Sequence, residues 1–274
     1  MVALTQKVNT REYEQLKVIV KKLAGVELGN NKQYLVESRF NPVMKEFNIS
    51  GFSNLINSIK MGRDKKLIEK FIDAITTHET LFFRDRTPFD ALKKLLMGDL
   101  GKKRKLRIWS AAASTGQEAY SIAMIIEDIN KRNSNKINYE ILGTDISEDV
   151  LEYAKKGAYR SYEVSRGLPK EYLSKYFDRE GTNYKIKNEL KRHITFKKFN
   201  LITGLYNFQK FDVVFCRNVL IYFDDLNKKL VYKKIASVLN DDGYLFIGSS
   251  ESLINYSTTF KKQAVEKTFV YTKN

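Results

Sequence analysis

The spacing of apolar residues divides the chain into a helical first part and a second part in which strands and helices alternate. Before about residue 75, apolar side chains recur at helical spacing, which predicts amphipathic helices. From about residue 91, short apolar runs of the kind found in buried strands alternate with helical stretches. Such alternation is typical of a parallel sheet covered by helices on both faces, so we predict an α/β fold preceded by a small helical domain.

The bounds of the expected elements follow from this pattern. Thr10 is the expected cap of a first helix that ends at Gly25. Further helices are expected over residues 32–47, 52–60 and 64–75, and strands over 106–110, 139–144, 194–199, 211–216, 243–249 and 268–272. In the second helix, the residues expected to face a core are Tyr34, Leu35, Val43 and Phe47.

We divide the chain into three parts on this basis. Residues 1–75 form the helical domain, 76–90 a linker or lid, and 91–274 the α/β domain. The alternation of strand and helix breaks between Gly157 and Arg192, and residues 172–193 are expected to form an inserted antiparallel β-subdomain. The small size of the helical domain favours docking over catalysis.

Composition adds a strong positive charge and a single cysteine. The 274 residues carry a formal charge of +16, which predicts attraction to an acidic partner, either nucleic acid or an acidic protein surface, unless it is only a lysine-rich solvated exterior. With Cys216 as the sole cysteine no internal disulfide can form, which fits the cytoplasm. No apolar run approaches the ~18 residues needed to cross a membrane, and the N-terminus lacks the apolar region of a signal peptide.

Residues 106–124, LRIWSAAASTGQEAYSIAM, read as a strand, a loop of small residues and a helix that starts near Gln117. No bulky side chain lies between Ala111 and Gly116, so a ligand could approach the backbone closely, and Gly116 can adopt dihedrals that other residues avoid. A strand, a tight loop and a helix N-terminus form a ligand crevice at the carboxyl end of a sheet.

The charge in this loop decides between cofactors. The phosphate-binding patterns G-x-x-x-x-G-K-[ST] and G-x-G-x-x-G are both absent. Glu118 near the helix start would repel a pyrophosphate and suits a cationic ligand, such as the sulfonium of S-adenosylmethionine. Alternatively, Glu118 only complements the helix dipole.

A second acidic residue ends the next predicted strand. Asp145, in the sequence GTDIS, follows Gly116 by 29 positions. In nucleoside-binding α/β folds, a carboxylate about 20 or more residues past the glycine loop accepts hydrogen bonds from the ribose hydroxyls. The alternative is a helix cap, but Ser147 fills that role more naturally.

Two further polar stretches complete the candidate site. The strand FDVVFC leads into RNVLIYFD, which places Arg217, Asn218 and Tyr222 at the same edge of the sheet as the small-residue loop. The second stretch, TTHETLFFR at residues 76–84, combines hydroxyls, a histidine and an arginine with two phenylalanines. We interpret it as an active-site lid rather than a plain hinge.

The segments THETLFFR, WSAAASTGQEAYSIAM, GTDIS and CRNVLIYFD occur in the order found in the chemoreceptor glutamate O-methyltransferases, the CheR family, which the chain resembles over nearly its whole length. The resemblance implies a class I, Rossmann-like S-adenosylmethionine-dependent methyltransferase fold with an all-helical N-terminal domain and a small β-subdomain. It implies methylation of glutamates on the cytoplasmic helices of chemotaxis receptors, with S-adenosylhomocysteine as product and no metal.

The resemblance also implies roles for individual residues. Arg84 and Tyr222 match the residues with a part in catalysis. The implied cofactor contacts are His78, Thr80, Arg84, Glu118, Asp145, Asn200, Leu201, Arg217 and Asn218. Two departures stand out, because His78 replaces the usual asparagine and Gln117-Glu118-Ala119 replaces the common Glu-Glu-Pro. The short segment 178–183 resembles members that do not tether to a receptor C-terminal pentapeptide.

Receptor methylation regions are glutamate-rich helices, so the basic second helix is the expected docking face. The candidate docking residues are Lys32, Arg39 and Lys45. We expect a cytoplasmic monomer that neither inserts into a membrane nor binds nucleic acid. Two rival functions are a nucleic-acid methyltransferase, which the absence of a proline after Asn218 opposes, and a non-catalytic module that senses S-adenosylmethionine.

Overall fold

The computed structural model describes residues 6–274, which divide into two compact units. The first unit runs to Thr77 and also takes in Tyr222–Asn227; the second comprises His78–Ile221 and Lys228–Asn274. The expectation that the chain begins without an apolar leader concerns in part residues 1–5, which lie outside the described range. Within that range, no helix is long and apolar enough to cross a membrane.

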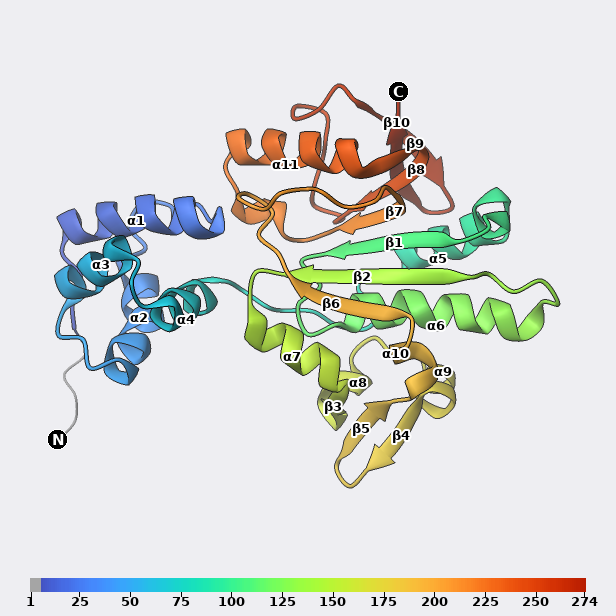
Figure 1. Ribbon diagram of the computed structural model, residues 1–274, viewed down its shortest axis with the longest axis horizontal. Helices are drawn as coiled ribbons and strands as arrows, with labels where there is room; N and C mark the ends of the chain where they lie inside the picture. The colour runs from blue at the N-terminus through green and yellow to red at the C-terminus, as the bar shows by residue number, and fades with distance from the viewer. Residues whose placement is uncertain (1–5) are drawn as a thin grey trace. The chain divides into compact units, whose positions relative to one another are not determined.

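Up to Thr77, the described part of the first unit contains the helices α1 (Thr10–Ala24), α2 (Gln33–Glu46), α3 (Phe52–Met61) and α4 (Lys65–Ile75) (Figure 1). The cap of α1 is Asn9 rather than Thr10; its side chain accepts from the Glu12 N–H, and the Glu12 side chain accepts from the Asn9 N–H. This reciprocal pair satisfies two N–H groups that a helix start leaves unpaired. At the other end Gly25 adopts a left-handed conformation, φ 75°.

The buried face of α2 differs from the sequence expectation. Tyr34 is 67% exposed, whereas Val36 and Phe40 are fully buried, and only Val43 of the expected positions is deeply buried. Phe40 stacks on Phe71 of α4 with ring centroids 4.3 Å apart. The aromatic partner on a distant helix sets the register of α2, and the local sequence does not reveal that partner.

Residues 222–227 belong to the first unit although they lie far from it in sequence. The Glu27 N–H donates to the Tyr222 carbonyl at 2.8 Å, and Val26 forms an isolated antiparallel bridge with Phe223. Lys21 pairs with Asp224 at 2.5 Å. The first unit is therefore discontinuous along the chain.

The second unit contains a seven-stranded sheet in the order β6-β2-β1-β7-β8-β10-β9. Its strands are β1 (Leu106–Ala111), β2 (Tyr139–Asp145), β6 (Ile194–Lys198), β7 (Phe211–Cys216), β8 (Leu239–Ile247), β9 (Phe260–Val265) and β10 (Thr268–Lys273). The pairs from β6 through β8 are parallel, and β10 is antiparallel to both of its neighbours. The expected parallel α/β sheet is confirmed for those five strands, and β9 is an addition that the sequence pattern did not predict.

The remaining helices are α5 (Thr87–Leu96), α6 (Gln117–Arg132), α7 (Glu148–Lys156), α8 (Ser161–Ser165), α9 (Lys170–Tyr176), α10 (Asn188–Lys191) and α11 (Asp225–Val238), with short 3-10 turns at Asp99–Lys102 and Leu220–Tyr222. Helix α6 is buried around most of its circumference, as expected for a helix between a sheet and further helices. As expected, Ser147 caps α7, its side chain accepting from the Val150 N–H.

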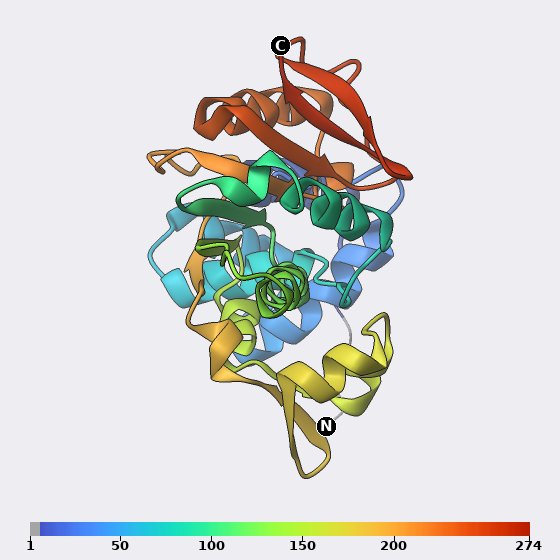
Figure 2. The same cartoon turned by 90° about the vertical axis from the view of Figure 1, so that its right-hand side faces the viewer.

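A separate three-stranded antiparallel sheet, in the order β3-β5-β4, forms the insertion. Its strands are β3 (Ala158–Arg160), β4 (Phe177–Glu180) and β5 (Asn183–Ile186). It begins at Ala158, before the expected start at residue 172, because a three-residue strand carries no alternating pattern. Within the second unit, the β4–β5 hairpin (yellow) and the C-terminal β9–β10 hairpin (red) lie at opposite ends (Figure 2).

Candidate functional site

The candidate site forms where the chain leaves β1. This strand pairs with β2 on one side and with β7 on the other, so the loop after it sits at the point where the strand order reverses. In parallel α/β sheets, ligands bind at this point, outside the carboxyl ends of the strands. The loop backbone is tightly turned, since Ala112, Ser114 and Gly116 all have positive φ, at 62°, 50° and 93°.

Close packing of neighbouring side chains explains why residue 116 is a glycine. A Cβ built on Gly116 would lie 2.9 Å from the Cβ of Ala154 and 3.2 Å from the rings of Phe196 and Tyr120. Together with φ 93°, this contact leaves room for glycine alone. The expected conformational freedom is confirmed, whereas the missing side chain makes room for helix α7 and strand β6 rather than for a ligand.

Asp145 lies at the carboxyl end of β2 and is almost completely buried. One carboxylate oxygen accepts from the Ser114 N–H at 2.8 Å and the other from the Ser147 N–H at 3.1 Å. Burial raises the pKa of Asp145, while these N–H groups and the charge of His78 oppose the rise. Asp145 therefore ties the small-residue loop to the end of β2.

His78 is connected to the same loop through its backbone. The Ser114 hydroxyl donates to the His78 carbonyl at 2.8 Å, which brings the start of the THETLFFR motif beside the turn that Asp145 holds. His78, Ser114 and Asp145 thus form one cluster, although they come from three separate segments of the chain.

Arg217 is the centre of a buried ionic network, with a side chain only 1% exposed. It donates to Glu118 at 3.0 Å, to Asp85 at 2.8 Å and to the Arg84 carbonyl at 2.9 Å. The second oxygen of Glu118 accepts from the Ser110 hydroxyl at 2.7 Å. The sequence predicted Glu118 and Arg217 as separate cofactor contacts, and the structure brings them together as an ion pair.

This pairing changes the electrostatic argument for Glu118. A carboxylate paired with a buried guanidinium presents less negative charge to a cationic ligand than an isolated one. The remaining lone pairs of Glu118 still accept hydrogen bonds, so the residue suits a hydroxyl or ammonium group of a ligand.

The segment that Arg217 holds is turned in an unusual way. Phe83, Asp85 and Arg86 all have positive φ, at 52°, 68° and 50°. Such conformations cost about 1–3 kcal/mol each and persist where surrounding contacts fix them, as at functional sites. Here the fixing contacts are the bonds from Arg217 to the Arg84 carbonyl and to Asp85, and the 3.0 Å bond from the Phe83 N–H to the Ser121 hydroxyl.

The two phenylalanines of the motif are core residues. Phe82 contacts Tyr159 and Phe177 edge-on, with centroids 5.0 and 5.6 Å apart, and Phe83 stacks on Tyr172 at 5.1 Å. A lid that moved these rings would expose both of them to water. Phe82 and Phe83 therefore serve the core, and a lid role for residues 76–90 stays a prediction.

The Arg84 guanidinium itself points back along the chain and donates to the Glu79 carbonyl at 3.0 Å. Thr80 lies between the two residues in the sequence. Their predicted cofactor and catalytic roles stay predictions.

Asn200 and Leu201 follow β6, which is the neighbour of β2 in the sheet. The Asn200 side-chain oxygen accepts from the N–H groups of Ile202 and Thr203 at 2.8 and 3.2 Å, and Leu201 is 7% exposed. The Phe199 N–H donates to the Asp145 carbonyl at 2.8 Å. The predicted adenine-edge residues thus begin directly beside the predicted ribose residue.

Asn218, directly after Arg217, has φ 57°, and its N–H donates to Glu251. Glu251 was not among the predicted residues, and neither were Asp85 and Ser110. The signal for Glu251 was an acidic residue shortly after an apolar strand, the same signal that pointed to Asp145.

The remaining predicted residues lie in the first unit. Tyr222 is 37% exposed, and Lys32, Arg39 and Lys45 are all exposed on or beside α2. Arg39 donates to the Ala74 carbonyl at 3.4 Å, so part of its side chain is held against the end of α4. Their roles in catalysis and docking stay predictions.

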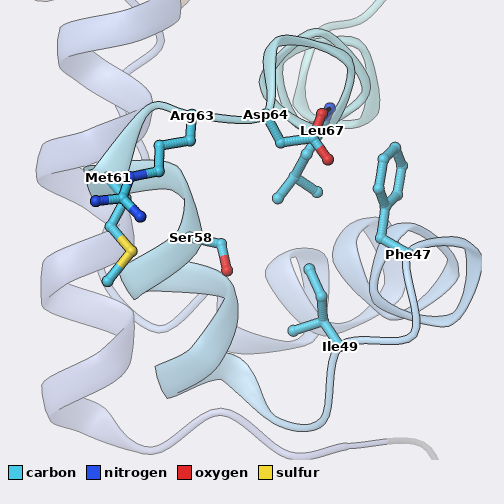
Figure 3. A pocket seen from close by; sticks show the side chains of 7 residues that line it. All are labelled: Phe47, Ile49, Ser58, Met61, Arg63, Asp64 and Leu67. Atoms are coloured by element: carbon cyan, nitrogen blue, oxygen red, sulfur yellow. Dashed lines mark hydrogen bonds between the residues drawn. The ribbon is translucent and has the colours of Figure 1, made fainter.

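The first unit also has a small pocket between the end of α2, α3 and the start of α4 (Figure 3). Its volume is about 250 Å³. Mainly apolar side chains line it, with Arg63 and Asp64 at the α3–α4 connection; the lining residues are Phe47, Ile49, Ser58, Met61, Arg63, Asp64 and Leu67. None of the predicted docking residues is among them.

The residues at the carboxyl edge of the sheet fit a nucleoside cofactor. Asp145 offers acceptors for hydroxyl groups, and the buried pair of Glu118 and Arg217 offers both an acceptor and a fixed positive charge. Among residues 6–274, no group of three or more histidine, cysteine, aspartate or glutamate side chains is arranged to hold a metal ion.

Two family models match this chain. Residues 78–269 match the S-adenosylmethionine-binding domain of CheR methyltransferases, and residues 11–76 match the all-alpha domain of the same family. These bounds lie close to the division between the two compact units.

Curated relatives match along most of their length. The chain is 41% identical to the chemotaxis protein methyltransferase Cher2 of Pseudomonas putida over 88% of this chain and 90% of that protein. It is 39% identical to a chemotaxis protein methyltransferase of Vibrio parahaemolyticus over 99% of each. A magnesium protoporphyrin IX methyltransferase structure from Synechocystis, at 12% identity and TM-score 0.39, covers 96% of this chain and 89% of its own.

The family models and the relatives confirm the resemblance seen in the motifs, the class I methyltransferase fold and the use of S-adenosylmethionine. Taken with the site at the carboxyl edge of the sheet, they show that this chain is an S-adenosylmethionine-dependent methyltransferase and belongs to the CheR methyltransferase family.

Proposed function

We propose that this enzyme methylates glutamate side chains on the cytoplasmic helices of chemotaxis receptors. The main support is similarity over almost the whole length of a chemotaxis protein methyltransferase. The candidate nucleoside site, at the point where the strand order of the sheet reverses, agrees with it. In this function S-adenosylmethionine supplies an electrophilic methyl group and leaves as S-adenosylhomocysteine.

The chain's own residues position the two reactants. A substrate glutamate is ionised at neutral pH because its usual pKa is about 4.3, so its oxygen attacks the methyl carbon without a general base. As the new C–O bond forms, the methyl–sulfur bond breaks and sulfur keeps the electron pair. Correct orientation of both groups removes roughly 7–11 kcal/mol from such a barrier in favourable cases.

The predicted residues take specific roles in this proposal. Asp145 accepts from the ribose, Asn200 and Leu201 border the adenine, and Glu118 accepts from the amino-acid part of the cofactor. His78, Thr80, Asn218 and the Arg217 network complete the cofactor pocket. Arg84 orients the substrate carboxylate, and Tyr222 orients the methyl group.

Charge supports the choice of an acidic helical substrate. The exposed side chains of Lys32, Arg39 and Lys45 on or beside α2 complement glutamate-rich receptor helices. We also propose that the protein acts in the cytoplasm as a monomer, without a metal, without binding nucleic acid and without using a receptor C-terminal pentapeptide.

Methyl transfer from labelled S-adenosylmethionine tests this function directly. We expect label on a receptor cytoplasmic fragment, released by mild base as expected for a methyl ester, and none on RNA or DNA. Label on RNA or DNA would refute the proposal in favour of a nucleic-acid methyltransferase. Cofactor binding without transfer to the receptor fragment, RNA or DNA would refute it in favour of a non-catalytic module.

The docking role has its own test. Lys45→Glu is expected to weaken receptor binding while the cofactor dissociation constant stays unchanged, and the wild-type affinity should fall with salt. The matched control is Arg63→Glu, an equal charge reversal at an exposed site in the same unit. Equal effects of the two variants would contradict a specific docking role for Lys45.

A further inference from the structure

Glu251 joins the ends of two neighbouring parallel strands. It follows β8 in the sequence GSSESL, and its carboxylate accepts three backbone hydrogen bonds. One oxygen accepts from the N–H groups of Asn218 and Gly248 at 2.8 and 2.6 Å, and the other from the Leu220 N–H at 3.1 Å. Asn218 and Leu220 belong to the loop after β7, so Glu251 fixes that loop to the end of β8.

The loop held in this way is the RNVLIYF segment. Asn218 lies in the left-handed region at φ 57°, a conformation that non-glycine residues rarely adopt without a fixing contact. Leu220 is the first residue of the 3-10 turn that ends at Tyr222. Arg217, which precedes Asn218, is held separately by Glu118 and Asp85.

The backbone at Gly248 packs closely against Glu251 and Asn218. A Cβ built on Gly248 would lie 2.6 Å from the Glu251 carboxylate oxygen, and 2.8 and 3.0 Å from the side-chain and backbone nitrogens of Asn218. A side chain at this position must therefore displace either the carboxylate or the loop.

The acceptor count explains why a carboxylate is needed. Three N–H donors converge on the group, and an ionised carboxylate presents acceptors on both oxygens. A glutamine would aim its own N–H₂ group at one of these donors, so at least one backbone bond would be lost. A hydrogen bond from a backbone N–H to a charged partner is also stronger than one to a neutral partner.

We infer that Glu251 is a positioning residue for methyl transfer, which sets the conformation of the loop that carries Asn218 and leads to Tyr222. It acts through the backbone of that loop and touches neither reactant. The inference rests on the proposed function for the substrate of the assay and for the roles of Asn218 and Tyr222.

Two substitutions disturb the same contact from opposite sides. Glu251→Gln removes the charge and one acceptor, whereas Gly248→Ala keeps the carboxylate and displaces it. For each we expect kcat on a receptor fragment to fall by at least about tenfold, which corresponds to losing one hydrogen bond to a charged group. The cofactor dissociation constant, measured by calorimetry, is expected to change less than kcat. Glu266→Gln, at an exposed turn in the same unit, is the matched control and should leave kcat unchanged.

The double variant provides the decisive measurement. If both substitutions act through one contact, kcat of Glu251→Gln/Gly248→Ala will be no lower than that of the more severe single variant. Multiplicative losses, or a single variant with full kcat, would overturn the inference. A wild-type enzyme that binds the cofactor but leaves receptor fragments unmodified would instead refute the proposed function. Should Glu251→Gln fail to fold, Gly248→Ala alone still decides through the comparison of kcat with cofactor affinity.

Discussion

Replacing Arg217 tests whether the buried network holds the active-site loop together. In Arg217→Met, the Glu118 carboxylate, only 13% exposed, loses its cation, and Asp85 and the Arg84 carbonyl lose a donor. Breaking a buried ion pair by removing one partner costs about 3–5 kcal/mol. This free-energy cost has an upper bound, because a carboxylate left without its cation can take up a proton, and protonating an ordinary glutamate at pH 7 costs about 4 kcal/mol. Asp85 is about one-third exposed and adds little, roughly 0–1 kcal/mol after solvent screening.

We therefore expect the free energy of unfolding of the second unit to fall by about 3–4 kcal/mol. The chain has a single tryptophan, Trp109, which is fully buried in β1 and reports on this unit. Urea unfolding at pH 7, followed by its fluorescence, measures the loss. The control is Arg166→Met, which removes an exposed ion pair to Glu79 and should cost less than about 1 kcal/mol.

A double variant separates the ion pair from simple loss of packing. Glu118→Gln alone is expected to cost about 1–2 kcal/mol, since Arg217 keeps Asp85 and the Arg84 carbonyl. With Arg217→Met already present, the same change removes the unpaired charge, so the double variant should be more stable than Arg217→Met alone. Losses that add to within about 0.5 kcal/mol would refute the reasoning, because they would show that the two side chains do not interact.

Three further predictions concern single residues. Gly116→Ala should lower the free energy of unfolding by about 2–4 kcal/mol, through a left-handed backbone and a clash with Ala154, measured by tryptophan fluorescence; no change would contradict this packing. Tyr13→Phe removes the 2.6 Å hydrogen bond to the Gly29 carbonyl and should lower the free energy of unfolding of the first unit by about 1 kcal/mol. Urea unfolding followed by circular dichroism measures the loss, and an unaltered unfolding curve would argue against that bond. Burial raises the pKa of Asp145. The cofactor affinity measured by calorimetry should therefore weaken as the pH falls through that raised pKa, because the neutral acid is a poorer acceptor for ribose hydroxyls. An Asp145→Asn variant with the same pH profile would disprove this role.

The sequence predicts elements well where local signals and burial agree. Strand β7 reads FDVVFC and is buried at every position, and the capping residue Ser147 marks the start of α7 correctly. The prediction failed where distant partners decide. Strand β9 buries only its first and last residues, so it lacks an alternating pattern, and the face of α2 depends on stacking between Phe40 and Phe71.

The same distinction applies to the site. Asp145 was predictable as an acid at the end of a strand, and its bonds to Ser114 and Ser147 support an anchoring role. The pairing of Glu118 with Arg217 was not predictable, because the two residues are 99 positions apart. Sequence motifs therefore predicted candidate residues that the structure brings together, such as Glu118 and Arg217, whereas the ion pairs of the Arg217 guanidinium with Glu118 and Asp85 required the structure.

The discontinuous first unit has a consequence for taking the enzyme apart. Residues 222–227 are held by the bridge from Phe223 to Val26, just after α1, and by the pair of Asp224 with Lys21 of α1, and Phe223 is only 7% exposed. A fragment that starts at His78 would carry residues 222–227 without these partners, and a fragment that stops at Thr77 would lack residues 222–227 of its own unit. A hybrid enzyme made by exchanging helical domains between relatives must therefore exchange residues 222–227 as well.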